Sequence, residues 1–173
     1  MVRRMPSSLL IGRAELIVGC DPECRGSTFP DRHQLAADLA AAVMAVEQVP
    51  DIPMFRKNTA AFVHDLPADA LSNVDGDRNY VRIQVLTNAG ALDRGKQLAV
   101  VERLTAIAAD AAGDPGLVSR TWVLLTEARD GGWGLAGHAN TNEELVLAAR
   151  APDREPARGH ARGPGLTIRA PHP

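Results

Sequence analysis

Two stretches of the chain share one pattern of apolar and polar residues, and each predicts a strand, a helix and a second strand. In the second stretch, "NYVRIQVL" (Asn79–Leu86) alternates with a period of two, which is typical of a strand. "TWVLLTEA" (Thr121–Ala128) predicts the closing strand. Between them, apolar residues recur at helical spacing and predict one stripe of a helix, formed by Leu98, Val101, Leu104, Ala108 and Ala111. A single helical crossover makes the two strands parallel and the connection right-handed.

The ends of this second helix are marked by residue types that begin and stop helices. Asp93 is a good N-cap, because its short carboxylate can accept a hydrogen bond from an unpaired backbone N–H of the first turn. Gly113 is expected just after the last helical residue, and Pro115 bars any continuation. The helix is therefore expected from Arg94 to Ala112.

The first stretch repeats the pattern less regularly. Its opening strand is expected at Ala14–Cys20 and its closing strand at Asn58–Pro67. Asp31 is expected to cap the helix between them, which Pro50 and Pro53 are expected to end. The apolar stripe of that helix is expected to be Leu35, Leu39, Val43 and Val46.

The repeat predicts an α+β fold in which two tandem β-α-β units form a four-stranded sheet with both helices on one face. The units are near-equal in length, which predicts a pseudo-twofold axis between them. The expected division is an N-terminal extension (1–13), a diverged first unit (14–67), a linker (68–78), a second unit (79–150) and a disordered tail (151–173).

Composition narrows the classes of function. Apolar residues make up 45% of the 173 residues and aromatic residues only 3%, so the core must be largely aliphatic. The formal net charge of −2 suggests neither nucleic acid nor a membrane surface as a partner. Arg13 and Glu15 interrupt the one N-terminal apolar stretch that resembles a signal peptide, so a cytoplasmic location is expected. Cys20 and Cys24 read as free thiols, because a metal site would need further ligands nearby.

One face of the predicted sheet is left without a helix. It carries Tyr80, Arg82, Gln84, Trp122 and Leu124, which is too mixed for a buried core and too apolar for bare water. Such a face is often covered by other subunits, so an oligomer is expected.

The segment "RTWVLLTEARDGGWGLAG" (Arg120–Gly137) places a tryptophan among glycines directly after a strand and an acidic turn. This arrangement resembles the tautomerase superfamily, the group of 4-oxalocrotonate tautomerase, in its fused two-unit form. The resemblance implies that the segment folds back as a short hairpin whose aromatic side chain lines the active site. It also implies a homotrimer, keto–enol proton transfer on a small 2-oxo acid or phenylpyruvate-like substrate, and no cofactor or metal.

The general base of that family is an N-terminal proline at the start of the first strand. In this chain Pro6 fills that role only if translation starts at Met5 and that methionine is removed. A terminal secondary amine is basic, whereas the nitrogen of an internal proline is part of an amide. Twenty-four residues separate Pro6 from Asp31, which is more than one strand and one turn require.

The resemblance also suggests the residues that hold the substrate. Trp133 is expected as an apolar wall or as a plug at a subunit interface. The substrate-binding arginine of the family aligns with Trp122, so Arg120, Arg56 and Lys57 are the candidates for binding a carboxylate. The remaining candidate, a histidine that acts as an acid or polarises a carbonyl, is His64. For the three cations the alternative is a solvated charge at a strand start, and for the histidine it is an ordinary hydrogen-bonding role.

Two other classes of protein remain open at this point. One is a non-catalytic tautomerase-fold oligomer or small-molecule-binding protein, which differs from the enzyme in its mature N-terminus. The other is a ferredoxin-like regulatory module, which shares the β-α-β repeat but does not account for the Gly–Trp–Gly hairpin.

Overall fold

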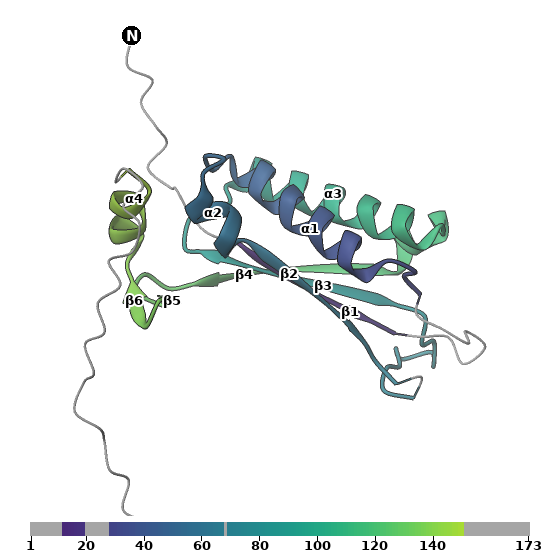
Figure 1. The fold of residues 1–173 in the computed structure, drawn as a ribbon. Helices are drawn as coiled ribbons and strands as arrows, with labels where there is room; N and C mark the ends of the chain where they lie inside the picture. Colours follow the sequence, from purple (N-terminus) through teal and green to yellow (C-terminus); the bar gives the residue numbers. More distant parts are fainter. Residues whose placement is uncertain (1–11, 20–27, 68, 151–173) are drawn as a thin grey trace, which may run out of the picture.

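The computed structural model describes residues 12–19, 28–67 and 69–150 (Figure 1). Pro6, Cys20, Cys24 and the expected tail (151–173) lie outside the described residues. In chain order the elements are β1 (Arg13–Val18), α1 (Arg32–Glu47), α2 (Pro53–Asn58), β2 (Ala60–Asp65), β3 (Val81–Asn88), α3 (Arg94–Ala112), a 3-10 helix η1 (Pro115–Arg120), β4 (Thr121–Ala128), β5 (Trp133–Leu135), β6 (His138–Asn140) and α4 (Asn142–Arg150).

Four strands form one mixed sheet in the order β2-β1-β3-β4. β1 is parallel to β2 and β3 is parallel to β4, which confirms the two β-α-β units. The units meet through β1 and β3, which are antiparallel, with Leu16 opposite Ile83. The two parallel pairs therefore run in opposite directions, as the predicted pseudo-twofold relation requires.

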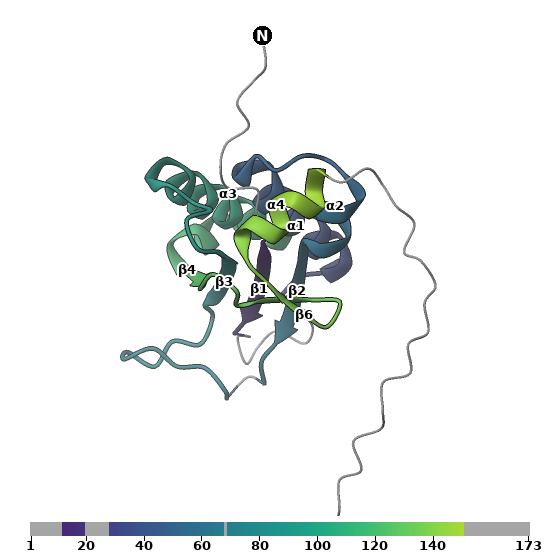
Figure 2. The same cartoon turned by 90° about the vertical axis from the view of Figure 1, so that its left-hand side faces the viewer.

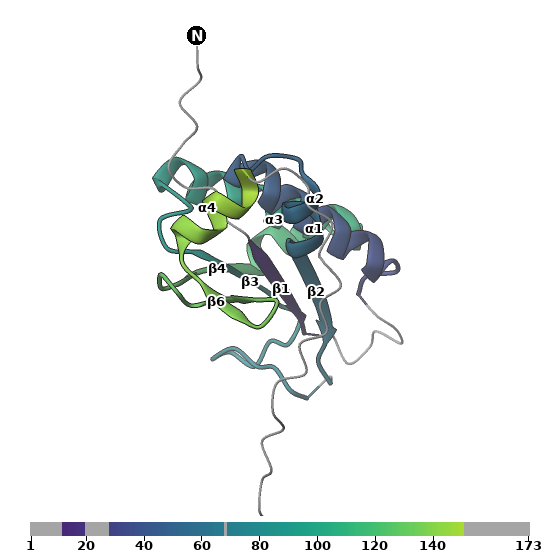
Figure 3. The same cartoon turned by 60° about the vertical axis from the view of Figure 1, so that its left-hand side comes forward.

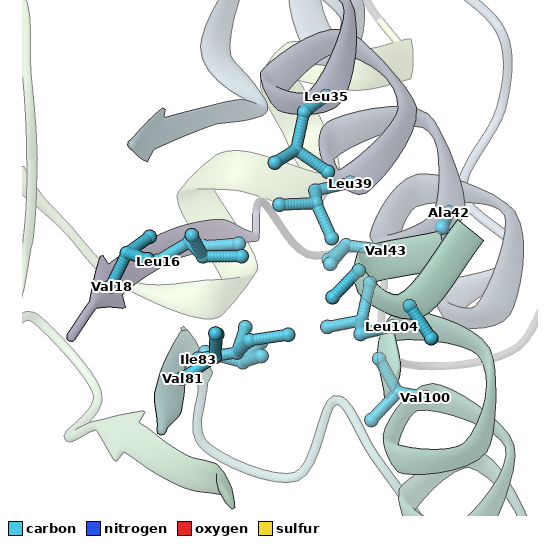
Figure 4. Close-up of a cluster of buried hydrophobic side chains, with 14 of the residues drawn as sticks. Leu16, Val18, Leu35, Leu39, Ala42, Val43, Val81, Ile83, Val100 and Leu104 are labelled. Carbon is cyan, nitrogen blue, oxygen red and sulfur yellow. The ribbon is translucent and has the colours of Figure 1, made fainter. Parts of the chain in front are cut away.

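Both long helices cover the same face of this sheet, as predicted (Figure 1). Every second residue of β1 and β3 points into the layer between sheet and helices, and α1 and α3 supply the facing side chains. Figure 4 shows this aliphatic core, whose buried members include Leu16, Val18, Leu35, Leu39, Val43, Val81, Ile83, Val100 and Leu104. The predicted caps are also present, since Asp31 and Asp93 accept hydrogen bonds from the N–H groups of Gln34 and Lys96.

The predicted apolar stripe of α3 is wrong at two positions. Leu98 is 56% exposed and Val101 is 37% exposed, whereas Val100 is fully buried. In a helix each residue turns by about 100°, so Leu98 lies roughly 120° away from the buried Leu104 around the axis. The face that meets the sheet follows the four-residue spacing of Val100, Leu104 and Ala108.

The predicted end of the first helix is also partly wrong. α1 stops at Glu47, where Gln48 turns the backbone into the left-handed region with a φ of 62°. Pro53 does not end a helix but begins the short helix α2, a position where its missing N–H costs nothing. α2 delivers Arg56 and Lys57 to the start of β2.

The face of the sheet opposite the helices carries large side chains that the chain itself leaves exposed. Phe62, Trp122 and Leu124 are 38%, 43% and 45% exposed. Tyr80 stacks on Trp122 with their ring centroids 4.8 Å apart. Separately, no helix in the described part of the chain has both the length and the apolar character needed to cross a membrane.

Candidate functional site

The chain after β4 folds back as the predicted hairpin. Gly131 has a φ of 76°, and the N–H of Gly132 donates to the carbonyl oxygen of Arg129 at 2.8 Å, which closes the charged turn. A side chain on Gly132 would place its Cβ 2.8 Å from that same oxygen, so the turn requires glycine there. β5 and β6 are then joined by Ala136 and Gly137, both with positive φ, as a tight two-residue hairpin requires.

This hairpin crosses the end of the sheet at which β1 and β2 begin (Figure 2). Because β1 is antiparallel to β3, Arg13 at the start of β1 pairs with Leu86 near the end of β3. The hairpin, the sheet end and the end of α2 enclose a groove of about 380 Å³. Its lining residues are Arg13, Lys57, Asn58, Ala60, Phe62, Leu86, Gly132, Trp133, Gly134 and Leu135.

The groove combines positive charge with aromatic walls. Arg13 and Lys57 are the cations among the described lining residues, and none of those residues is acidic. The guanidinium carbon of Arg13 lies 4.2 Å from the centroid of the Phe62 ring, which is a cation–π distance. Trp133 supplies the second aromatic side chain, from the hairpin. These features suit a small ligand that carries a carboxylate and a planar apolar part.

A small second core holds the hairpin in place. Phe55 of α2 and Leu145 of α4 are fully buried against each other, and Trp133, Leu135 and Val146 are among the half-buried residues around them. Figure 3 shows α4 and the hairpin together at this end of the sheet. Trp133 therefore lines the groove and also belongs to this packing cluster.

Polar contacts fix the start of α4, which follows the hairpin directly. The side-chain amide of Asn88 donates to the side-chain oxygen of Asn142 at 3.1 Å, so the end of β3 is tied to α4. Thr141 and Glu144 form a capping box, in which each side chain accepts a hydrogen bond from the backbone N–H of the other. Hydrogen bonds from the Thr141 backbone and then from His138 lower the pKa of Glu144 below its usual value.

The structure brings two of the predicted site residues together. Trp133 and Lys57 both line the groove. Arg56, the neighbour of Lys57, points elsewhere and pairs with Asp51 at 3.0 Å. Pro6, the predicted base, lies outside the described residues, seven positions before Arg13.

The remaining predicted residues lie outside the groove within one chain. Arg120 is at the opposite end of β4, where its guanidinium pairs with Asp114 and donates to the carbonyl oxygen of Asn79. His64 is exposed on β2, and its ring stacks on Phe62 with a centroid separation of 6.5 Å. Trp122, which aligns with the substrate-binding arginine of the family, lies on the open face of the sheet.

Sequence reasoning missed Arg13 and Phe62 as residues of the groove. Arg13 was assigned to the N-terminal extension, one residue before the expected strand, whereas β1 begins at Arg13 itself. Phe62 lies in the expected closing strand, but no alternation was assigned to that strand, so its face was not predicted. Their proximity to Trp133 could not be predicted, because it depends on the antiparallel pairing of β1 with β3.

Comparison with solved structures identifies the fold. The fused 4-OT F6, an asymmetric trimer, matches with a TM-score of 0.58 and 18% identity over 77% of this chain and 98% of that chain. Pt0534 inactivated by 2-oxo-3-pentynoate matches with a TM-score of 0.57 and 17% identity over 77% of this chain and 96% of that one. A macrophage migration inhibitory factor-like protein from Entamoeba histolytica matches with a TM-score of 0.55 and 15% identity, over 73% and 96% of the two chains.

The chain therefore has the fold of the tautomerase superfamily, and its two units correspond to the fused arrangement. The resemblance seen in the sequence is confirmed at this level. No protein-family model and no curated protein sequence matches the chain.

The packing of Leu145 predicts how the groove wall is held. Leu145→Ala leaves a cavity under α4, which is expected to cost about 2–5 kcal/mol of local stability. Backbone amides of β5 and β6 should then exchange with deuterium at least about tenfold faster, while amides of β1 and β3 change little. The matched control is Leu147→Ala on the same helix, where the side chain is 57% exposed and no change is expected. If both variants change the amide exchange of β5 and β6 equally, Leu145 does not hold the hairpin in place.

Proposed function

We propose that the protein is a tautomerase-like isomerase that moves a proton between the keto and enol forms of a small 2-oxo acid or phenylpyruvate-like substrate. The observation that carries the proposal is the groove at the start of β1, which joins two cations to two aromatic side chains. The fold shared with the fused 4-OT proteins supports the same reaction class.

Each part of the groove has a chemical task in this reaction. Arg13 and Lys57 bind the substrate carboxylate, and a guanidinium can do so with two parallel hydrogen bonds. Phe62 and Trp133 lie against the planar apolar part of the substrate and exclude water. Exclusion of water strengthens the electrostatic contacts that stabilise the negative charge of the enolate.

The proton is carried by the amine of Pro6 in the form of the chain that begins at that residue. A terminal amine has a pKa near 8, and any cation close to such an amine disfavours its protonated form. The free amine then takes a proton from the carbon next to the carbonyl of the keto form, or from the hydroxyl of the enol form, and returns it at the other position.

We also propose that the working form is a homotrimer. The open face of the sheet exposes Phe62, Trp122 and Leu124, and a second copy of the chain would cover them. Fused 4-OT structures with the same fold are trimers. In such an assembly Arg120, Arg56 and His64, which lie outside the groove of their own chain, act only if a neighbouring chain presents them to its groove.

A second candidate function rests on the residues at which β1 begins. Gly12 and Arg13 stand at the start of the first strand, where the family has its proline. If no basic amine lies at this groove, the groove can bind a carboxylate but cannot move a proton. The protein would then be a non-catalytic, small-molecule-binding oligomer of the same fold.

Ketonisation of phenylenolpyruvate separates these two functions. We expect activity in a form of the chain that begins at Pro6 and none in a form that begins at Met1. Pro6→Ala should abolish the activity, because the ring that fixes the direction of the basic nitrogen is lost, and Trp133→Ala should weaken it by roughly 10-fold. Arg13→Ala should raise KM. Arg120→Ala should have little effect on KM if the role of Arg120 is only to hold Asn79 and Asp114 within its own chain.

Activity that is equal in both forms would point to another base, and His64→Ala then tests the first alternative. Binding of phenylpyruvate without turnover in either form would favour the non-catalytic oligomer. If Arg13→Ala binds phenylpyruvate as tightly as the wild type does, the groove is not the binding site.

The assembly is tested by light scattering at micromolar concentration. The wild-type chain is expected at three times its monomer mass of 18.4 kDa. Leu124→Lys places a charge on the open face, on the edge strand β4, and should produce monomers. Leu98→Lys, on the helix-covered side of the molecule and 56% exposed, is the control and should remain trimeric. A stable wild-type monomer would rule the trimer out.

A further inference from the structure

Among the residues that the structure describes, one acidic side chain is buried without a hydrogen-bonding partner. Glu47 is the last residue of α1, and it is only 2% exposed. Neither Oε1 nor Oε2 receives a hydrogen bond within the described part of the chain. A carboxyl group in such surroundings needs an explanation, because burying an unpaired charge is costly.

The carboxyl of Glu47 lies directly against the start of the first strand. A Cβ atom added to Gly12 would lie 3.0 Å from Oε1 and 3.1 Å from Oε2 of Glu47, and 2.5 Å from Cγ1 of Val43. Only glycine leaves room for this close approach. The next residue of the chain, Arg13, points to the other side of the sheet and lines the groove.

Among the described residues, the charged group that faces Glu47 is Lys96 of α3. Its ammonium donates to the backbone carbonyl oxygen of Glu47 at 2.8 Å rather than to the carboxyl. Gly12, directly before β1, faces the carboxyl of Glu47 and the side chain of Val43, both from α1. Burial raises the pKa of Glu47 to about 8, and the charge of Lys96 offsets only part of that rise. The carboxyl is therefore mostly protonated at neutral pH.

We propose that Glu47 is a positioning residue whose neutral carboxyl allows the start of β1 to pack against α1, and that loss of its proton releases that strand start and Arg13 with it. The pairing of Arg13 with Ala60 and Leu86 stands at the very end of the ladders of β1. Strand ends open at lower free energy than strand centres, so this end gives way first. The role of Arg13 in the groove rests on the proposed function, but the movement of the strand start does not.

The direction of the stability change follows from the proton count. The native state keeps the proton of Glu47 up to about pH 8, whereas the unfolded state loses it near pH 4.5. The stabilisation linked to this proton is fully present below about pH 4.5 and is lost as the pH rises to about 8. Above that pH the contribution no longer changes.

The proposal can be tested by NMR on the full chain, with carbon-13 labels on the glutamate carboxyl and on the Cα atoms of Gly12 and Arg13. Between pH 5.5 and 9.5, the Glu47 carboxyl signal is expected to titrate with a midpoint near 8. The Cα signals of Gly12 and Arg13 should move with the same midpoint. A Glu47 carboxyl signal that already has the position of an ionised carboxylate at pH 5.5 and does not change up to pH 9.5, or Cα signals that stay still, would overturn the proposal.

Two variants separate this role from general stability. Glu47→Gln keeps the shape and cannot ionise, so the Cα signals of Gly12 and Arg13 should no longer titrate. Its Tm at pH 9 should exceed that of the wild type by at least about 5 °C. Glu102→Gln, at an exposed position of α3, is the matched control and should behave as the wild type. If the Gly12 Cα signal shifts with pH in Glu47→Gln as it does in the wild type, another titrating group causes the movement.

The consequence for the groove is measured with 3-phenylpropionate, a carboxylate that cannot be turned over. Its Kd should rise at least threefold between pH 7 and 9.5 in the wild type and less than twofold in Glu47→Gln. If the Kd does not depend on pH while the Cα signal of Gly12 does, the strand start moves but the movement has no effect on ligand binding by Arg13. Absence of binding at every pH would contradict the proposed function. The pH dependence of the Gly12 Cα signal tests the strand movement independently of that result.

Discussion

The antiparallel pairing of β1 with β3 is the constraint on which the rest of the structure depends. It places Arg13 opposite Leu86, so the start of the first strand of one unit meets the end of the first strand of the other. Each β-α-β unit alone has a parallel pair of strands whose apolar face a single helix covers. Joined through β1 and β3, the two units share one core, and the two helices lie on the same face.

The same pairing creates the groove. β4 leaves the sheet at the end where β1 and β2 begin, and its hairpin folds across that end. Glycine at positions 131, 132 and 137 allows the two tight turns, and α4 holds the hairpin through Leu145. Local backbone chemistry and one small apolar cluster thus bring Trp133 to the cations of β1 and α2.

Much of the fold could be predicted from periodicity. The alternation at Val81, Ile83 and Val85 indicated the buried face of β3, and Asp31 and Asp93 marked the starts of both long helices. The stripe of α3 was assigned too broadly, because alanine-rich helices offer several apolar faces and only packing selects one. The short helices α2 and α4 were missed. α2 has only six residues and therefore gives no periodic signal. α4 could have been predicted, because its apolar residues lie on one side and Thr141 and Glu144 form a recognisable capping box. In the site, Trp133 and Lys57 were predicted from a motif and from charge, whereas Arg13 required the strand pairing.

The most direct test of the account is a map of backbone amide shifts on addition of phenylpyruvate to the full chain. The largest changes are expected at Arg13, Phe62 and Trp133, at the end of the sheet where β1 begins. Changes centred on Arg120 and Asp114, at the opposite end of β4, would contradict the account.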